Sequence, residues 1–267
     1  EDGDRAGGWQ EGPGYWEYGI GHCAEFAAAL KLFTGGGVDL FRHPYLKRTG
    51  DFPIYMTAAP GRFWNWSDCG KTAGGSLTLC ILAREYRNRA YQAAALRGGV
   101  SSVRHLFYLD LDLKKEAPSA ESGFGLTRLY PDTGVAVMRT GFGPDDAFVG
   151  VKAGVIGPAV NHEHADRGSI VIHAGGRELL AELEGWPYAQ YTGRAGGFFD
   201  KRGKRWDYDG NDIVGHNLVV LEGRYPPFSA AARARLDRLD LGSACELVAV
   251  DATAMHRTLA RGVRRYV

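Results

Sequence analysis

The sequence predicts an α+β protein of two domains, in which a helical domain precedes an antiparallel β domain. Apolar residues recur at helical spacing in residues 17–33 and again in residues 75–97, which indicates helices that bury one face. After residues 114–125, KKEAPSAESGFG, apolar and polar residues alternate and β-branched residues are frequent, as in strands. We therefore place a helical domain at residues 1–115 and an antiparallel β-sandwich at residues 122–267.

The two expected helices are EYGIGHCAEFAAALKLF and GSLTLCILAREYRNRAYQAAALR, and they predict helical hairpins. The segment between them contains several Pro and Gly residues, so we expect a loop with short helices at most. In the second domain the expected strands are GVAVMRTGF, DAFVGVKAGV, GSIVIHAGG, HNLVVLEG and CELVAVDAT. Turn residues separate these runs, and strands at this spacing predict an antiparallel sandwich.

Composition excludes several classes of function. The 267 residues can bury a sizeable core. Lys and Arg number 32 against 31 Asp and Glu, a formal charge of +1, so neither a nucleic-acid partner nor a polybasic membrane surface is indicated. No run of about 18 apolar residues predicts a membrane helix. The four cysteines form no CxxC pair, which argues against a thiolate zinc site and leaves their disulfide state open: Cys23, Cys69, Cys80 and Cys245.

Histidines cluster in VNHEHADRGSIVIHAGG, residues 160–176. His162 and His164 flank Glu163 at or just before an expected strand. The period of two places both imidazoles on one face of such a strand. Two histidines on one β face are a common beginning of a metal site, although the pair also suits an ordinary polar strand edge.

Further metal donors lie downstream. Glu182 follows His164 by 18 residues in ELLAELEGWPY, and His216 begins the expected strand HNLVV. Three such donors at the ends of neighbouring strands would form a nitrogen and oxygen site suited to zinc. Glu184 is an alternative carboxylate because it shares a strand face with Glu182.

Several segments together resemble the heparinase II/III-like polysaccharide lyases. They occur in that family's order: GGWQEGPGYWEYG (7–19), TGDFPIYMTAAPGRFWNWSD (49–68), NHEHADRGSIVI (161–172), ELLAELEGWPY (178–188) and GHNLVVLEG (215–223). The resemblance implies the last helices of an (α/α) toroid followed by most of a β-sandwich, cut short at its C-terminus. The chain is thus expected to be a piece of a longer protein.

The resemblance also implies residue roles. Tyr15, after EGPG, matches the family's catalytic tyrosine, and His162 matches a histidine that faces the substrate. His164 and His216 match ligands of a structural zinc. Glu182 stands where the family usually has an Asp in LL-x-D-P-G, so this chain keeps the carboxylate but lengthens it and lacks the Pro.

Aromatic and basic residues near these positions are candidates for substrate binding. Trp16 is adjacent to Tyr15, and a Trp ring is as often part of a core or a wall as a platform for a sugar. Tyr188, Tyr191 and Arg194 lie in WPYAQYTGR, on an expected loop near the metal. They could contact hydroxyls or carboxylates of a saccharide, and a solvated loop is an equal alternative.

The function implied is β-elimination on an acidic, uronic-acid-containing polysaccharide such as a glycosaminoglycan or alginate, by a bacterial periplasmic or secreted enzyme. The family's Asn-His pair on an earlier helix would lie upstream of Glu1, and whether the chain is active without that pair stays open. One alternative is a non-catalytic glycan-binding module of the same fold. Another is a cupin-like metal oxidoreductase, although a cupin would need a Glu where Arg167 or Gly168 stands. The particular polysaccharide, endo or exo action and the oligomeric state stay open.

Overall fold

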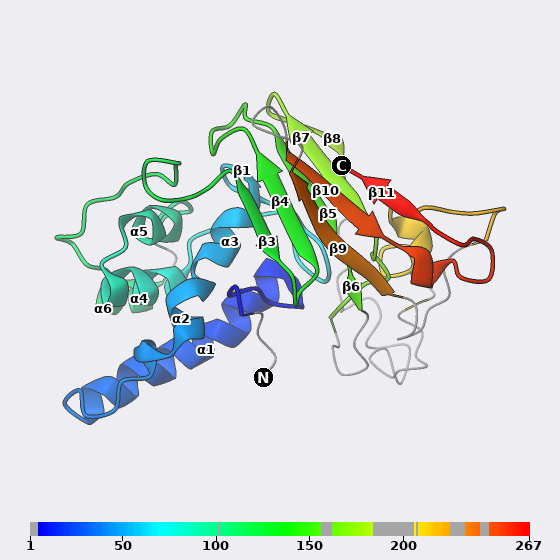
Figure 1. Cartoon of the computed structure of the whole chain (residues 1–267). Coiled ribbons are helices and arrows are strands. Elements are labelled where there is room, and N and C mark those ends of the chain that lie inside the picture. The colour runs from blue at the N-terminus through cyan, green and yellow to red at the C-terminus, as the bar shows by residue number, and fades with distance from the viewer. Residues whose placement is uncertain are drawn as a thin grey trace.

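A computed structural model describes residues 5–100, 102–155, 162–183, 206, 208–224, 233–240 and 246–267. Helices occupy one side of the molecule and sheets the other (Figure 1). The helices are α1 (Gly12–Phe33), α2 (Pro44–Thr49), α3 (Asp51–Tyr55), α4 (Leu77–Tyr86), α5 (Arg89–Ala95) and α6 (Val103–Tyr108), with 3-10 turns η1 (Leu40–Arg42), η4 (Ile213–Gly215) and η5 (Thr253–Met255). The strands are β1 (Thr57–Ala59), β2 (Arg62–Phe63), β3 (Thr127–Tyr130), β4 (Val135–Arg139), β5 (Phe148–Lys152), β6 (Gly154–Val155), β7 (Ile170–Ala174), β8 (Arg177–Leu180), β9 (Arg233–Asp240), β10 (Glu246–Asp251) and β11 (Arg264–Tyr266).

The strands of the second half form two antiparallel sheets. One has five strands in the order β3-β4-β5-β7-β8, and the other has four in the order β11-β10-β9-β6. A small hairpin, β1-β2, precedes them within the helical half. The predicted fold class, helices followed by antiparallel sheets, is confirmed.

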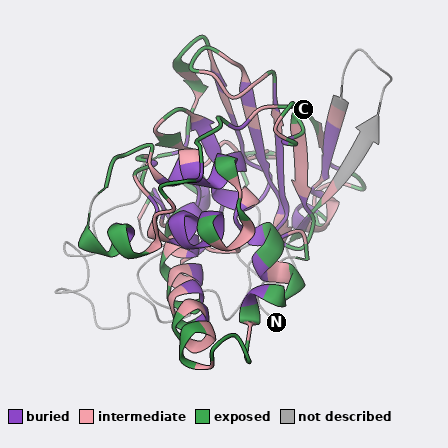
Figure 2. Cartoon of the chain, turned by 90° about the vertical axis from the view of Figure 1, so that its left-hand side faces the viewer, coloured by how far each residue is buried: buried purple, intermediate pink, exposed green. Residues whose placement is uncertain are grey.

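The five-stranded sheet lies between the helices and the four-stranded sheet. Val135 and Val137 of β4 pack into the core shared with the helices, whereas Ala136, between them, packs with Val248 and Val250 of β10. Successive residues of a strand point to opposite faces, so this alternation produces a sandwich and joins the two halves through one buried surface. Figure 2, viewed from the helical side, shows buried residues gathered where the helices meet the sheet.

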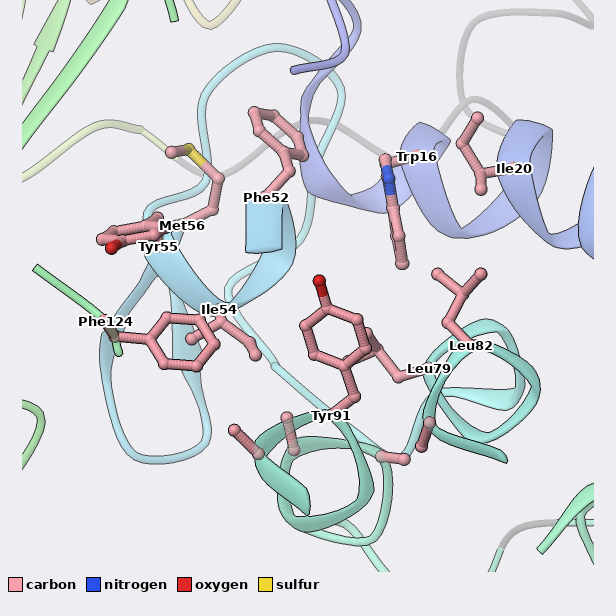
Figure 3. Close-up of a cluster of buried hydrophobic side chains, with 14 of the residues drawn as sticks. Trp16, Ile20, Phe52, Ile54, Tyr55, Met56, Leu79, Leu82, Tyr91 and Phe124 are labelled. Carbon is pink, nitrogen blue, oxygen red and sulfur yellow. The ribbon is translucent and has the colours of Figure 1, made fainter. Parts of the chain in front are cut away.

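The helical half has its own close packing. Side chains from α1, α3, α4 and α5 belong to one buried cluster, in which Trp16, Leu79 and Tyr91 lie close together between α1 and the pair α4 and α5 (Figure 3). Tyr91 donates a hydrogen bond to Asp51 at 2.8 Å, which satisfies its hydroxyl inside this apolar cluster.

A polar contact joins the long helix α1 to α4. Ser76 caps α4, accepting a hydrogen bond from the Leu79 amide at 2.9 Å. The Glu17 carboxylate accepts from Ser76 at 2.5 Å and from the Thr78 amide at 3.2 Å. A carboxylate at a helix N-terminus is favoured both by the free amides and by the helix dipole. None of the described helices, α1 included, is both long and apolar enough to span a membrane.

Three local predictions differ from the structure. The expected helix 75–97 is two helices, because Arg87 adopts a left-handed φ of 54° at the end of α4 and Asn88 caps α5. The β1-β2 hairpin lies in the segment expected to be a loop. The strand expected at HNLVV, residues 216–220, is absent from the described structure, where that backbone is irregular.

Candidate functional site

Tyr15 lies in the first turn of α1, and a glycine determines where that turn begins. Gly12 has a φ of +85°, and a Cβ added to it would lie 2.8 Å from the Trp66 carbonyl oxygen. Only glycine accommodates both conditions without strain. The partly exposed Tyr15 ring stacks on the His162 ring with a centroid separation of 3.7 Å and an interplanar angle of 17°. The phenol of the helical half and an imidazole of the β half are therefore brought together.

His162 and His164 precede β7 in irregular backbone, and they meet at one carboxylate. Asp68, from the loop between β2 and α4, has one oxygen 3.0 Å from His162 Nδ1 and the other 2.7 Å from His164 Nε2. The His162 side chain is 19 % exposed and that of His164 only 3 %. The expectation that both imidazoles project from one face of a strand is therefore wrong, because the segment that carries them is not extended strand.

Behind the histidines lies a buried ion cluster. Arg167 donates hydrogen bonds to both Glu163 and Asp166, and all three side chains are at most 2 % exposed. Burial opposes the charge of Asp166, but Arg167 and Lys152 together hold its pKa below the ordinary value. Buried charges require such partners. The charged side chains of HEHADRGS thus stabilise the segment rather than face the solvent.

Glu182 and His216 form a second buried pair. Ser169 donates to one Glu182 oxygen at 2.7 Å, and the other oxygen lies 2.5 Å from His216 Nδ1. The two partners are 1 % and 3 % exposed. Burial disfavours the charged imidazole, but the hydrogen bond and charge of Glu182 raise the pKa of His216 above its ordinary value.

Gly215 and Asn217 of the GHN motif have structural roles that the sequence did not predict. A Cβ on Gly215 would lie 1.8 Å from the Asp209 carbonyl oxygen, so only glycine fits before His216. Asn217 then binds the backbone of Ile170 twice, accepting from its amide at 3.0 Å and donating to its carbonyl at 2.6 Å. Its side chain therefore takes the place of a neighbouring strand at the start of β7.

The donor chemistry for zinc is present, although three donors do not converge. His216 Nε2 is buried and has no hydrogen-bond partner, and the His164 and His216 rings are 5.6 Å apart. Two imidazole nitrogens with a nearby carboxylate suit zinc in kind. Glu182, however, is turned toward His216 Nδ1. Within the described part of the chain, no group of three or more His, Cys, Asp or Glu residues is arranged to hold a metal. Zinc therefore stays a prediction.

The other candidates have different outcomes. The prediction that Trp16 binds substrate is wrong, because its indole is 0 % exposed and donates to Thr49 at 2.7 Å within the core. Tyr188, Tyr191, Arg194 and Glu184 lie outside the described residues. Asp68, which contacts both histidines, was not singled out in the sequence, since a carboxylate about ninety residues upstream gives no spacing signal.

No protein-family profile and no curated protein sequence matches this chain. Several solved structures match this chain. Heparan sulfate lyase HepC from Pedobacter heparinus superposes with a TM-score of 0.67 and 14% identity, over 95% of this chain and 35% of that one. A crystal structure of heparinase III gives 0.64 and 15%, over 92% and 36%, and a second heparinase III structure gives 0.61 and 17%, over 92% and 34%. This chain thus spans about a third of the length of each. It has a heparinase-like fold.

Proposed function

We propose that this chain carries the tyrosine and histidine of a polysaccharide lyase active site that cleaves acidic, uronic-acid-containing polysaccharides by β-elimination. The observation that supports this most directly is the stack of the partly exposed Tyr15 ring on the His162 ring, between the helices and the sheet. A phenol and an imidazole in contact are two groups able to transfer protons near neutral pH.

The reaction needs two proton transfers and one bond cleavage. A base removes the proton on C5 of the uronate, the electron pair forms the C4–C5 double bond, and the bond from C4 to the glycosidic oxygen breaks. That oxygen must take up a proton. Tyr15 donates it from its hydroxyl. The base is His162 or, for the other sugar face, the Tyr15 phenolate, which takes up the C5 proton and then donates that proton to the leaving oxygen.

His164, Glu182 and His216 are the residues that would hold zinc, and the bound ion would fix the HxH segment structurally. In this proposal the ion takes no part in the proton transfers. Its effect on His162 is indirect, because His162 is only two residues from His164. The HepC neighbour is named a heparan sulfate lyase, which supports the same reaction class here. In this proposal the enzyme is periplasmic or secreted.

The test is an assay of the full-length protein, of which this chain is expected to be a part, on a panel of uronic-acid polymers. Product is detected by the ultraviolet absorbance of the unsaturated uronate. Tyr15→Phe should lower kcat by about 10²- to 10⁴-fold, the usual contribution of a general acid or base, with the same unfolding transition. Tyr18→Phe, on the same helix and 67 % exposed, is the matched control and should retain activity.

The assay also separates the alternatives. Saccharide binding without unsaturated product from the native protein would favour a glycan-binding module. Full activity of Tyr15→Phe would remove Tyr15 from the reaction. The cupin-like oxidoreductase gains no support, because the fold is heparinase-like.

A further inference from the structure

Asp68 reaches the histidines from a tightly held loop of the helical half. The loop follows β2, and Trp64 and Trp66 anchor it in the core with 1 % exposure each. Ser67 is fully buried and adopts a φ of 56°, a left-handed conformation that is uncommon for residues other than glycine. Its hydroxyl has no hydrogen-bond partner. Such local costs persist only where surrounding contacts impose the geometry, and here the geometry directs Asp68 toward the sheet.

Three contacts join Asp68 to the HxH segment. Its carboxylate oxygens contact His162 Nδ1 at 3.0 Å and His164 Nε2 at 2.7 Å, and its amide donates to the His162 carbonyl at 3.1 Å. The Asp68 side chain is only 7 % exposed. Little water therefore competes for these contacts.

The chemistry of the carboxylate determines where the ring protons are. An ionised carboxylate can only accept hydrogen bonds. Both contacting ring nitrogens must therefore carry hydrogen. When the imidazoles are neutral, the unprotonated nitrogen is Nε2 in His162 and Nδ1 in His164, so the two histidines are opposite tautomers.

We propose that Asp68 is a positioning residue that sets the tautomer and the orientation of both histidines at once. Resting on the proposed function, this makes Nε2 the basic nitrogen of His162, the ring that stacks on Tyr15. It makes Nδ1 the basic nitrogen of His164, whose ring lies 5.6 Å from that of His216. One carboxylate thereby couples the reacting histidine to the histidine expected to bind metal.

The decisive measurement is the tautomer of each ring in the metal-free chain, with no need for activity. Histidine labelled with ¹⁵N reports its tautomer through long-range proton–nitrogen correlations, recorded at mildly alkaline pH. In the native chain we expect His162 protonated on Nδ1 and His164 on Nε2. The opposite tautomer at either ring, in the folded native chain, would overturn the proposal.

Variants test the cause. Asp68→Asn replaces one acceptor by an NH₂ donor, so only one ring N–H can still donate to this side chain, and the histidine that faces the NH₂ group should change its tautomer. Asp68→Glu restores two acceptors and should restore both tautomers. Glu178→Gln is the matched control, because Glu178 also lies beside a histidine (His173, 3.8 Å) and joins the two halves through Arg62 at 2.9 Å. It should leave the signals of His162 and His164 unchanged.

Kinetics of the full-length protein test whether Asp68 affects catalysis. Where Asp68→Asn changes the tautomer of His162, kcat should fall by about 10²- to 10⁴-fold, as expected when a catalytic histidine is held in the wrong tautomer, with little change in KM. Where only His164 changes, and in Glu178→Gln, kcat should be retained. Unchanged tautomers and unchanged kcat in a folded Asp68→Asn would refute the positioning role. If the native protein shows the expected tautomers but makes no unsaturated product, the lyase proposal fails while the assignment of Asp68 stands.

Discussion

Gly12 offers the sharpest test of how the α1 turn is built. Gly12→Ala introduces two separate costs. A left-handed φ costs an alanine about 1–2 kcal/mol, partly offset by about 0.4–1 kcal/mol because alanine has less freedom than glycine in the unfolded chain. The new Cβ would also lie 2.8 Å from the Trp66 carbonyl oxygen, and relieving such overpacking costs about 1–3 kcal/mol. We expect a total loss of about 2–4 kcal/mol in the free energy of unfolding.

Two further glycines separate those costs. Gly61 has a φ of +80° with nothing within 4 Å of an added Cβ, and Gly262 has open space and no left-handed φ. Gly61→Ala should therefore lose about 1 kcal/mol, and Gly262→Ala should gain about 0.4–1 kcal/mol. Urea unfolding followed by tryptophan fluorescence measures all three. If Gly12→Ala is no less stable than Gly61→Ala, the close approach of the Trp66 carbonyl does not constrain this turn.

Two other expectations concern buried ionisable groups. Burial lowers the pKa of Lys152 from 10.5 to about 8, so the unfolded chain binds more protons between about pH 8 and 10.5. The free energy of unfolding should therefore rise with pH across this interval by up to about 3 kcal/mol relative to Lys152→Met. The same pH dependence of the free energy of unfolding in both proteins, measured by urea unfolding, would contradict this. Burial also raises the pKa of Cys69 to about 12 and of Cys80 to about 11, whereas Cys23 is exposed. Because the thiolate is the reactive form, a thiol reagent should modify Cys23 first among these three. Cys23→Ser should remove the fast phase of labelling. Rapid labelling of Cys69 in the folded protein would contradict this expectation.

The elements that the sequence predicted well are those whose burial follows a local period. The alternation in GVAVMR predicts β4 because its odd and even positions face different cores. β9, RARLDRLD, was not predicted, since its many charged residues conceal the alternation. The break between α4 and α5 was missed for a related reason, because a left-handed Arg87 has no sequence signature comparable to glycine.

The candidate site was predictable only in part. The resemblance identified Tyr15 and His162, and the structure brings their rings together. No period or spacing in the sequence relates a residue of the first helix to one in the β half. Asp68 shows the same limit more strongly, because its role depends on a loop whose direction is determined by buried tryptophans and by Ser67 in an unfavourable conformation.

The orientation of the two histidines has a cause outside their own segment. A period of two applies to side chains only where neighbouring strands hold the backbone extended. Between residues 162 and 168 the backbone bonds go elsewhere: the His162 carbonyl accepts from Asp68, the Ala165 amide donates to Asn211 at 2.9 Å, and the Gly168 amide donates to Lys152 at 2.7 Å. Backbone groups find partners wherever they are available, and here the partners come from three separate parts of the chain. The rings can therefore converge on one carboxylate although they are two residues apart, and their geometry depends on contact between the two halves. A substitution that loosens this contact should move both histidines together, even at a distance from either ring.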